Sequence, residues 1–212
     1  MSSELLRIPA ADVHIEGLLE LPGDARGVVL FAHGSGSSRH SPRNGQVARS
    51  LREQGSGTLL LDLLTLAENL DYHTRFDITL LTHRLLIATA YVMLHTPASR
   101  HLPIGYFGAS TGAAAALQAA AALGDKVQAV VSRGGRADLA GTHELAKVTA
   151  PTLLLVGGAD TEVLALNREA YARLRCEKEL VVVPGASHLF EEAGALDEVA
   201  RQAADWFSRH WR

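Results

Sequence analysis

Apolar residues in this chain gather in short runs that alternate with segments of helix length. The runs are bounded by turn residues and are as long as β-strands. The first run alternates apolar and polar residues, so we expect an antiparallel strand at the edge of a sheet. Most of the others are continuously apolar, as in parallel strands that are covered on both faces. The runs span residues 13–21, 27–34, 57–64, 102–108, 127–135, 151–158 and 179–185.

Amphipathic or alanine-rich segments lie between these runs and predict helices. Asp77 is a suitable N-cap for the second segment, and Pro97 would end it. The alternation of strand and helix favours the α/β class, in which helices cover both faces of a mostly parallel central sheet in three layers. No repeat, low-complexity linker or break in composition divides the chain, so we expect residues 1–212 to form a single domain. The segments span residues 43–55, 77–95, 111–123, 161–175 and 196–211.

Composition and charge narrow the range of partners. Of the 212 residues, 47% are hydrophobic and 20% are charged, and the formal net charge is −3. Because Lys and Arg form no block, we expect neither nucleic acid nor a membrane as a partner. The N-terminal segment lacks the basic start and apolar core of a signal peptide, which predicts a cytoplasmic protein.

The sequence contains no recognisable motif for a metal or a cofactor. Cys176 is the only cysteine, which excludes an internal disulfide and CxxC-type zinc or redox sites. The segment HELAK at 143–147 begins like a zincin helix, but Lys147 replaces the second histidine. The glycines match neither the P-loop nor the dinucleotide-binding pattern. We therefore expect neither a metal nor a cofactor.

Ser110 stands between an apolar run and an alanine-rich segment, with Gly108 and Gly112 on either side in the pattern G-x-S-x-G. A sharp strand-to-helix turn would raise the hydroxyl above the edge of the sheet, where side chains at the flanking positions would collide with backbone. The N–H groups of the following helix would point towards the same place. We predict a nucleophile at Ser110; a turn that serves only packing is the alternative.

A serine nucleophile needs a base and an acid that orients the base. Asp160 follows the run 151–158, and His188 follows the run 179–185. In a parallel sheet these positions share one edge with Ser110, and the order Ser, Asp, His is the one this arrangement uses. Taken singly, Asp160 could instead be a helix N-cap and His188 an ordinary surface histidine.

The segment FAHGSGSSRH follows the run 27–34 and predicts an oxyanion hole. One N–H would come from Thr111, the residue after the predicted nucleophile, and another from Ser35 in this early loop. Gly34 and Gly36 would let the loop backbone approach closely. His33 is interpreted as a residue that braces the loop rather than as a catalytic group.

Four motifs together, HGSG, GASTG, LLLVGGAD and VPGASHLF, resemble the α/β-hydrolases, most closely the lid-less branch similar to dienelactone hydrolase. The resemblance extends from about residue 13 to the C-terminus. It implies an α/β-hydrolase fold without a separate cap domain, with Ser110 as nucleophile, His188 as general base and Asp160 as orienting acid. It also implies the backbone N–H groups of Ser35 and Thr111 as oxyanion donors. Dienelactone hydrolases have a cysteine where this chain has Ser110, which leaves acyl transfer as the implied chemistry and the dienelactone substrate open.

These residues predict a serine hydrolase that cleaves a carboxylic ester or lactone, its small-molecule partner, through an acyl-enzyme. Thioester hydrolysis and acyl transfer use the same machinery and stay open, as does a ligand-binding homologue without turnover. The short connection between residues 131 and 151 predicts an open site. Residues 64–77 are interpreted as its local cover, with a simple connection between elements as the alternative.

Two arginines follow strand ends at the predicted edge of the site. Arg39 comes after the oxyanion loop, and Arg133 lies in the run 127–135. Their guanidinium groups would suit a carboxylate or phosphate on the substrate. The alternative is that both are solvated or ion-paired arginines.

Overall fold

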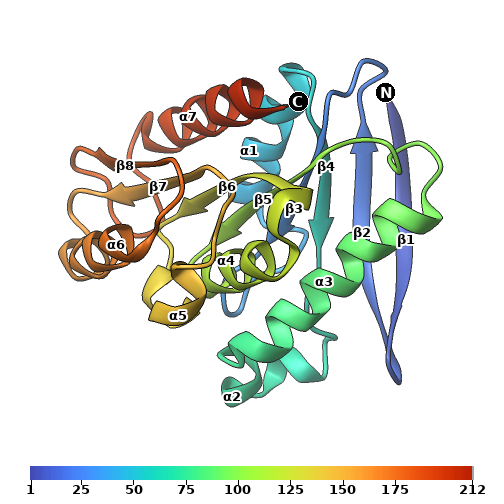
Figure 1. Cartoon of the computed structure of the whole chain (residues 1–212), viewed down its shortest axis with the longest axis horizontal. Helices are drawn as coiled ribbons and strands as arrows, with labels where there is room; N and C mark the ends of the chain where they lie inside the picture. The colour runs from blue at the N-terminus through green and yellow to red at the C-terminus, as the bar shows by residue number, and fades with distance from the viewer. Residues whose placement is uncertain (212) are drawn as a thin grey trace.

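The strands form one sheet in the order β1-β2-β4-β3-β5-β6-β7-β8 in a computed structural model that describes residues 1–211 (Figure 1). Strands β3 to β8 are parallel, whereas β2 is antiparallel to both β1 and β4. The mostly parallel sheet predicted from the sequence is therefore confirmed. The strands are β1 (Ser2–Ala10), β2 (Val13–Leu21), β3 (Val28–Ala32), β4 (Gly57–Leu61), β5 (Ile104–Ala109), β6 (Val127–Arg133), β7 (Thr152–Gly157) and β8 (Lys178–Val183).

Helices cover both faces of the sheet, which confirms the three layers. The core on one face is formed with α3 and α4, and the core on the other face with α1 and α7. The α-helices are α1 (Pro42–Glu53), α2 (Tyr72–Arg75), α3 (Ile78–His95), α4 (Thr111–Leu123), α5 (Thr142–Leu145), α6 (Thr161–Arg173) and α7 (Ala195–His210). The 3₁₀-helices are η1 (Glu68–Leu70), η2 (Gly124–Lys126) and η3 (Ala137–Ala140).

The sequence interpretation placed the strand at 13–21 on the edge of the sheet, and this was wrong. Strand β1 pairs with β2 from Ser2 opposite Leu21 to Ala10 opposite Val13, so β1 is the edge strand. The period-two pattern that could have revealed it is weak, because only Leu6, Ile8 and Ala10 are buried in this strand. Its other positions carry polar residues, the exposed Leu5, and a proline that an edge strand tolerates.

Helix α3 begins and ends as its sequence predicts. The Asp77 side chain accepts the Leu80 N–H at 2.9 Å, and the helix ends at His95, before Pro97. By length and composition alone α3 could cross a membrane, a property that the sequence interpretation missed. It instead packs against the sheet and α4, with Leu81, Leu85 and Val92 buried in the core.

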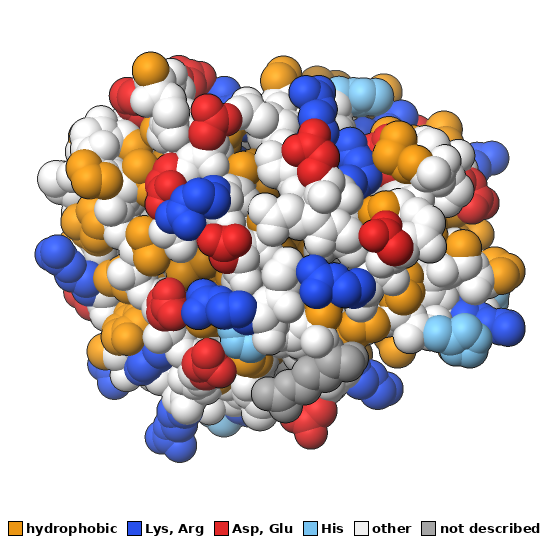
Figure 2. Space-filling model, turned by 90° about the horizontal axis from the view of Figure 1, so that it is seen from above, with side chains coloured by type: hydrophobic (Ala, Val, Ile, Leu, Met, Phe, Trp, Pro, Cys, Tyr) orange, Lys and Arg blue, Asp and Glu red, His pale blue; other side chains and the backbone are white. Residues whose placement is uncertain are grey.

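The connections at the carboxyl ends of the strands decide how open the molecule is there. Between β6 and β7 the chain forms only η3 and α5, so no separate cap domain is present in the described part of the chain. Positively and negatively charged side chains are mixed over the face of the molecule seen in Figure 2. This face therefore presents no patch of a single charge.

Candidate active site

The predicted catalytic residues follow strand ends at one edge of the sheet. Ser110 comes directly after β5, Asp160 after β7, and His188 in the loop after β8. His188 Nδ1 and Asp160 Oδ2 are 2.7 Å apart, which is hydrogen-bond distance. Two side chains that are 28 positions apart in the chain are thus brought together. Because the carboxylate accepts the Nδ1 hydrogen, the other ring nitrogen of a neutral His188 is left as an acceptor.

Ser110 has a strained backbone, with φ 50° and ψ −123°. Residues that carry a Cβ rarely adopt this conformation, which costs about 1–3 kcal/mol and persists where the surroundings impose it. The Ser110 N–H donates to the Arg133 carbonyl at 3.3 Å, and its own carbonyl accepts the N–H groups of Ala113 and Arg136. These three bonds hold the turn between β5 and α4.

The glycines around Ser110 are required by close packing, as the sequence predicted. A Cβ on Gly112 would lie 2.1 Å from the Ala32 carbonyl oxygen, and one on Gly108 would lie 2.4 Å from the Ala113 Cα. A Cβ on Gly34 would lie 2.9 Å from the Ser110 Cβ. A Cβ atom essentially never lies within 3.0 Å of a non-bonded atom. Glycine at these positions therefore allows the oxyanion loop and the Ser110 turn to pack directly against each other.

The end of β6 lies between Ser110 and His188. Arg133 accepts the Ser110 N–H, and a Cβ on the next residue, Gly134, would be 3.1 Å from the His188 carbonyl oxygen and 3.5 Å from its Nδ1. Within residues 1–211 no hydrogen bond joins the Ser110 hydroxyl to His188. Such bonds are often long in enzymes without substrate and shorten when it binds.

Phe190 shapes the loop that carries His188, and sequence reasoning missed it. It has φ 57° and is buried, and its N–H donates to the Ser187 carbonyl at 3.2 Å. A bulky residue at positive φ is a backbone outlier, and no sequence signal marks it. The tight turn from Ser187 to Phe190 fixes the direction in which His188 leaves the backbone.

His33 braces the oxyanion loop, as predicted. Its Nδ1 donates to the Gly34 carbonyl at 2.9 Å, and its Nε2 accepts the Leu63 N–H at 3.1 Å. Both bonds fit a neutral imidazole, and burial lowers the pKa of His33 below the value of a free histidine. His33 therefore ties the loop after β3 to the segment after β4.

The two predicted oxyanion donors contact each other in an unforeseen way. The Ser35 N–H donates to the Thr111 hydroxyl oxygen at 3.0 Å. A substrate oxygen would therefore have to replace this hydroxyl before the Ser35 N–H could bind it. The role of both backbone N–H groups stays a prediction.

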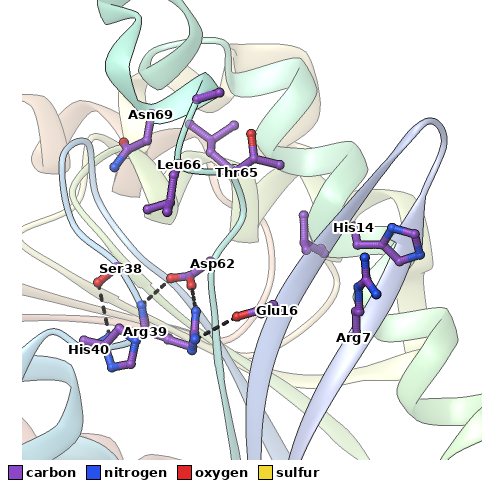
Figure 3. A pocket seen from close by; sticks show the side chains of 13 residues that line it. Arg7, His14, Glu16, Ser38, Arg39, His40, Asp62, Thr65, Leu66 and Asn69 are labelled. Carbon is purple, nitrogen blue, oxygen red and sulfur yellow. Dashed lines mark hydrogen bonds and ion pairs between the residues drawn. The ribbon is translucent and has the colours of Figure 1, made fainter.

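Arg39 is paired with carboxylates and is not a free cation, and its predicted role in substrate binding stays a prediction. Its side chain contacts the carboxylates of Asp62 and Glu16, the latter at 2.7 Å, and its N–H donates to Asp62 at 2.6 Å (Figure 3). Glu16 lies in β2 and Asp62 directly follows β4, so the residues next to Arg39 in the sequence could not predict these ion pairs. Arg39 is an ion-paired residue of the loop, which was the alternative interpretation.

Arg133 is buried beneath the first turn of α1. Its side chain is 8% exposed, and its Nη2 reaches only the Asn44 side-chain oxygen, at 3.5 Å. Burial and the nearby charge of Arg43 lower the pKa of Arg133 to about 10, so the side chain is still charged at pH 7. Its predicted role in substrate binding stays a prediction.

A pocket of about 570 Å³ lies beside the oxyanion loop and not over the catalytic residues (Figure 3). It is bounded by the β1–β2 hairpin, the loop around Arg39 and the segment 64–69. Leu64 and Asn69 also line a small hollow next to Ser35 and Thr111. We place the candidate site by the Asp160–His188 bond and the Ser110 turn, because the reaction needs these groups and the pocket contains none of them.

A solved structure described as dienelactone hydrolase from Anabaena variabilis is 52% identical to this chain. The two superpose with a TM-score of 0.94, over 100% of this chain and 99% of the other. The chain belongs to the dienelactone hydrolase-like α/β-hydrolases. Both the resemblance inferred from the motifs and the α/β-hydrolase fold are thereby confirmed.

Other comparisons extend this family assignment. An α/β serine hydrolase without a lid, from Xanthomonas campestris, shares the fold at 22% identity, with a TM-score of 0.79 over 99% of this chain and 95% of that one. No family model matches the chain. Proteins from two strains of Mycobacterium tuberculosis, provisionally named phosphoribosyl transferases, are 52% identical over 210 residues. That match covers 99% of this hydrolase and 47% of each relative, so the chain spans about half their length.

Proposed function

We propose that this chain hydrolyses carboxylic ester or lactone bonds through a Ser-His-Asp triad formed by Ser110, His188 and Asp160. The Asp160–His188 hydrogen bond of 2.7 Å, at the same sheet edge as the strained Ser110 turn, is the observation that carries the proposal. Membership of a family of hydrolases supports the class of reaction. The serine in place of the family's cysteine leaves the same acyl chemistry available to an oxygen nucleophile.

The reaction proceeds in two halves. The Ser110 hydroxyl oxygen attacks the carbonyl carbon while the free ring nitrogen of His188 takes its proton, and Asp160 stabilises the resulting imidazolium. When the tetrahedral intermediate collapses, His188 gives this proton to the leaving alcohol, and the acyl group stays on Ser110. Water, deprotonated by the same nitrogen, then releases the acid and restores the serine.

The developing oxyanion requires N–H donors near the Ser110 turn. The Thr111 N–H at the start of α4 is one, and the helix N-terminus there favours negative charge. The Ser35 N–H would be the second once the Thr111 hydroxyl releases it. On this proposal, the loop braced by His33 is the one that receives the substrate carbonyl.

Phosphoribosyl transfer has no comparable support. The Mycobacterium tuberculosis proteins with that name are about twice as long, and this chain matches only 47% of each. In the matched part, the groups that lie together are an acid, a histidine and a serine turn, which suit acyl transfer.

Covalent labelling of Ser110 tests the proposal. A fluorophosphonate should add one group to the protein, on Ser110, as read by mass spectrometry of peptides. Ser110→Ala should abolish labelling and lower kcat for a 4-nitrophenyl ester by on the order of 10³-fold or more. Ser37→Ala, a serine change in the neighbouring loop, serves as the control. Labelling of another serine, or near-normal activity of Ser110→Ala, would disprove the assignment.

A further inference from the structure

Arg133 differs from Arg84, the other buried arginine among residues 1–211, because no carboxylate neutralises it. Arg84 pairs with Glu68 at 2.8 Å, and Arg52 pairs with Glu20 at 3.0 Å. Among residues 1–211, Arg133 has neither a salt bridge nor a partner for its Nε and Nη1, although both nitrogens are buried. An unpaired buried charge is unfavourable by several kcal/mol, so a guanidinium held this way calls for an anion.

Arg43 is a second arginine close to Arg133, and an incoming anion could displace the carboxylate that pairs with it. Arg43 is near enough for its charge to lower the pKa of Arg133, and its Nε is likewise buried without a partner among the described residues. Its Nη1 contacts Glu191 at 2.9 Å, in a pair whose side chains are 34% and 62% exposed. Exposed ion pairs contribute at most about 1 kcal/mol, so Glu191 is easily displaced.

The first turn of α1 adds to the positive potential. Arg43 and Asn44 both belong to it, Asn44 contacts the Arg133 guanidinium, and the described helix has no acidic residue in this turn. Helix α1 has 12 residues, and the N-terminus of such a helix favours anions. Two guanidinium groups and a helix N-terminus therefore lie close together, and the only carboxylate that contacts either guanidinium among the described residues is the exposed Glu191, on Arg43.

The same place adjoins the catalytic residues. The Arg133 carbonyl accepts the Ser110 N–H at 3.3 Å, and Glu191 lies on the loop that continues from His188. An anionic group bound here would therefore lie close to the Ser110 turn.

We propose that Arg133, Arg43 and the first turn of α1 bind a phosphate group of the ester substrate, and that Glu191 occupies Arg43 when the phosphate is absent. A phosphate monoester carries nearly two negative charges at pH 7 and can balance both guanidinium groups, whereas a carboxylate would only exchange for Glu191. The assignment to the substrate rests on the proposed hydrolase function; the anion site itself does not.

Binding of inorganic phosphate tests the site without any catalysis. In the Ser110→Ala protein, phosphate at several times its Kd should raise the Tm by about 2–5 °C relative to sodium chloride of equal ionic strength. Arg133→Met should remove this phosphate-induced rise in Tm. If Arg133→Met folds poorly, Arg43→Met is the substitute variant and should remove the rise as well. Glu191→Gln should lower the phosphate Kd severalfold because it removes the competing carboxylate. Arg201→Met, which removes an exposed arginine on α7, should keep the shift.

Inhibition of ester hydrolysis then links the site to Ser110. In the wild type, phosphate should inhibit hydrolysis of a neutral 4-nitrophenyl ester competitively. In Arg133→Met, the Ki of phosphate should be at least about tenfold higher. A phosphate shift without detectable hydrolysis would leave the site standing and overturn the hydrolase proposal. An equal shift with acetate, a shift that survives in Arg133→Met and Arg43→Met, or no shift at all would overturn the phosphate site.

Discussion

Ser110 is held with φ 50° and ψ −123° by hydrogen bonds to Arg133 at the end of β6, to Arg136 in the loop after it and to Ala113 in α4, and the backbone strain is confined to this single residue. Its backbone is strained whichever side chain it carries, except when that residue is glycine. The effect of this backbone strain on the free energy of unfolding can therefore be measured independently of the role of the Ser110 hydroxyl in catalysis.

Replacing Ser110 by glycine should stabilise the protein more than replacing it by alanine. Release of about 1–3 kcal/mol of strain, less about 0.5–1 kcal/mol for the greater freedom of glycine in the unfolded chain, leaves a net gain of up to about 2.5 kcal/mol. Urea unfolding of Ser110→Gly and Ser110→Ala measures the difference. At Ser37, which does not have a positive φ, the same pair of substitutions should give the opposite sign. Equal stabilities of the two Ser110 variants would show that the strain does not exceed the cost of about 0.5–1 kcal/mol that glycine adds.

Residue types and strand ends were sufficient to predict that Ser110, Asp160 and His188 follow strand ends at one edge of the sheet, because parallel strands bring their carboxyl ends together there. What could not be predicted depends on tertiary partners. The sequence left open whether Arg39 is ion-paired, and the structure pairs it with Glu16 and Asp62. The sequence also provided no sign that the Thr111 hydroxyl accepts the Ser35 N–H. None of these three partners is a sequence neighbour.

The elements themselves follow from the sequence pattern to within a few residues, except at the N-terminal edge. Continuously apolar strands are recognisable because both of their faces are covered, whereas β1 is covered on one face only and escaped notice. Helix α1 also begins slightly earlier than predicted, because Pro42 occupies its first turn and the Ser41 side chain caps it.

Helix α1 contains a glycine that the fold does not require. A Cβ on Gly45 would meet no atom within 4 Å, so Gly45→Ala should raise the free energy of unfolding by about 0.5–1 kcal/mol through helix propensity. Thermal unfolding should show a Tm higher by about 1–4 °C. Gly105→Ala in β5 is the matched control and should destabilise, since its Cβ would lie 2.7 Å from the Phe207 ring. A loss of stability in Gly45→Ala would contradict the expectation.

For the whole molecule, buried His33 couples folding to pH. Burial lowers its pKa in the folded state, so the unfolded chain binds this proton more readily. Its contribution to stability is therefore complete above the unfolded pKa of about 6.5 and is lost as the pH falls below it.

The expected slope is up to about 1.4 kcal/mol per pH unit below pH 6.5. Urea unfolding at a series of pH values should show a smaller slope for His33→Asn than for the wild type, even though the variant is less stable overall. The negative charge of Asp62 raises the pKa of His33 and so opposes the effect of burial. Because Asp62 is present in both proteins, it does not account for a difference between their slopes. Identical slopes would show that His33 does not titrate on unfolding.

The order of the strands has a consequence for a chain that is still being made. From β5 onwards, spatial order in the sheet repeats order in the sequence, and β8 is last in both. During translation, Ser110 is therefore made first and Asp160 two strands later. His188 is made last, in the loop after β8. On the proposed roles, a nascent chain presents a serine without a base from the time Ser110 is made until His188 is made, and it becomes reactive only when the outermost strand has joined the sheet.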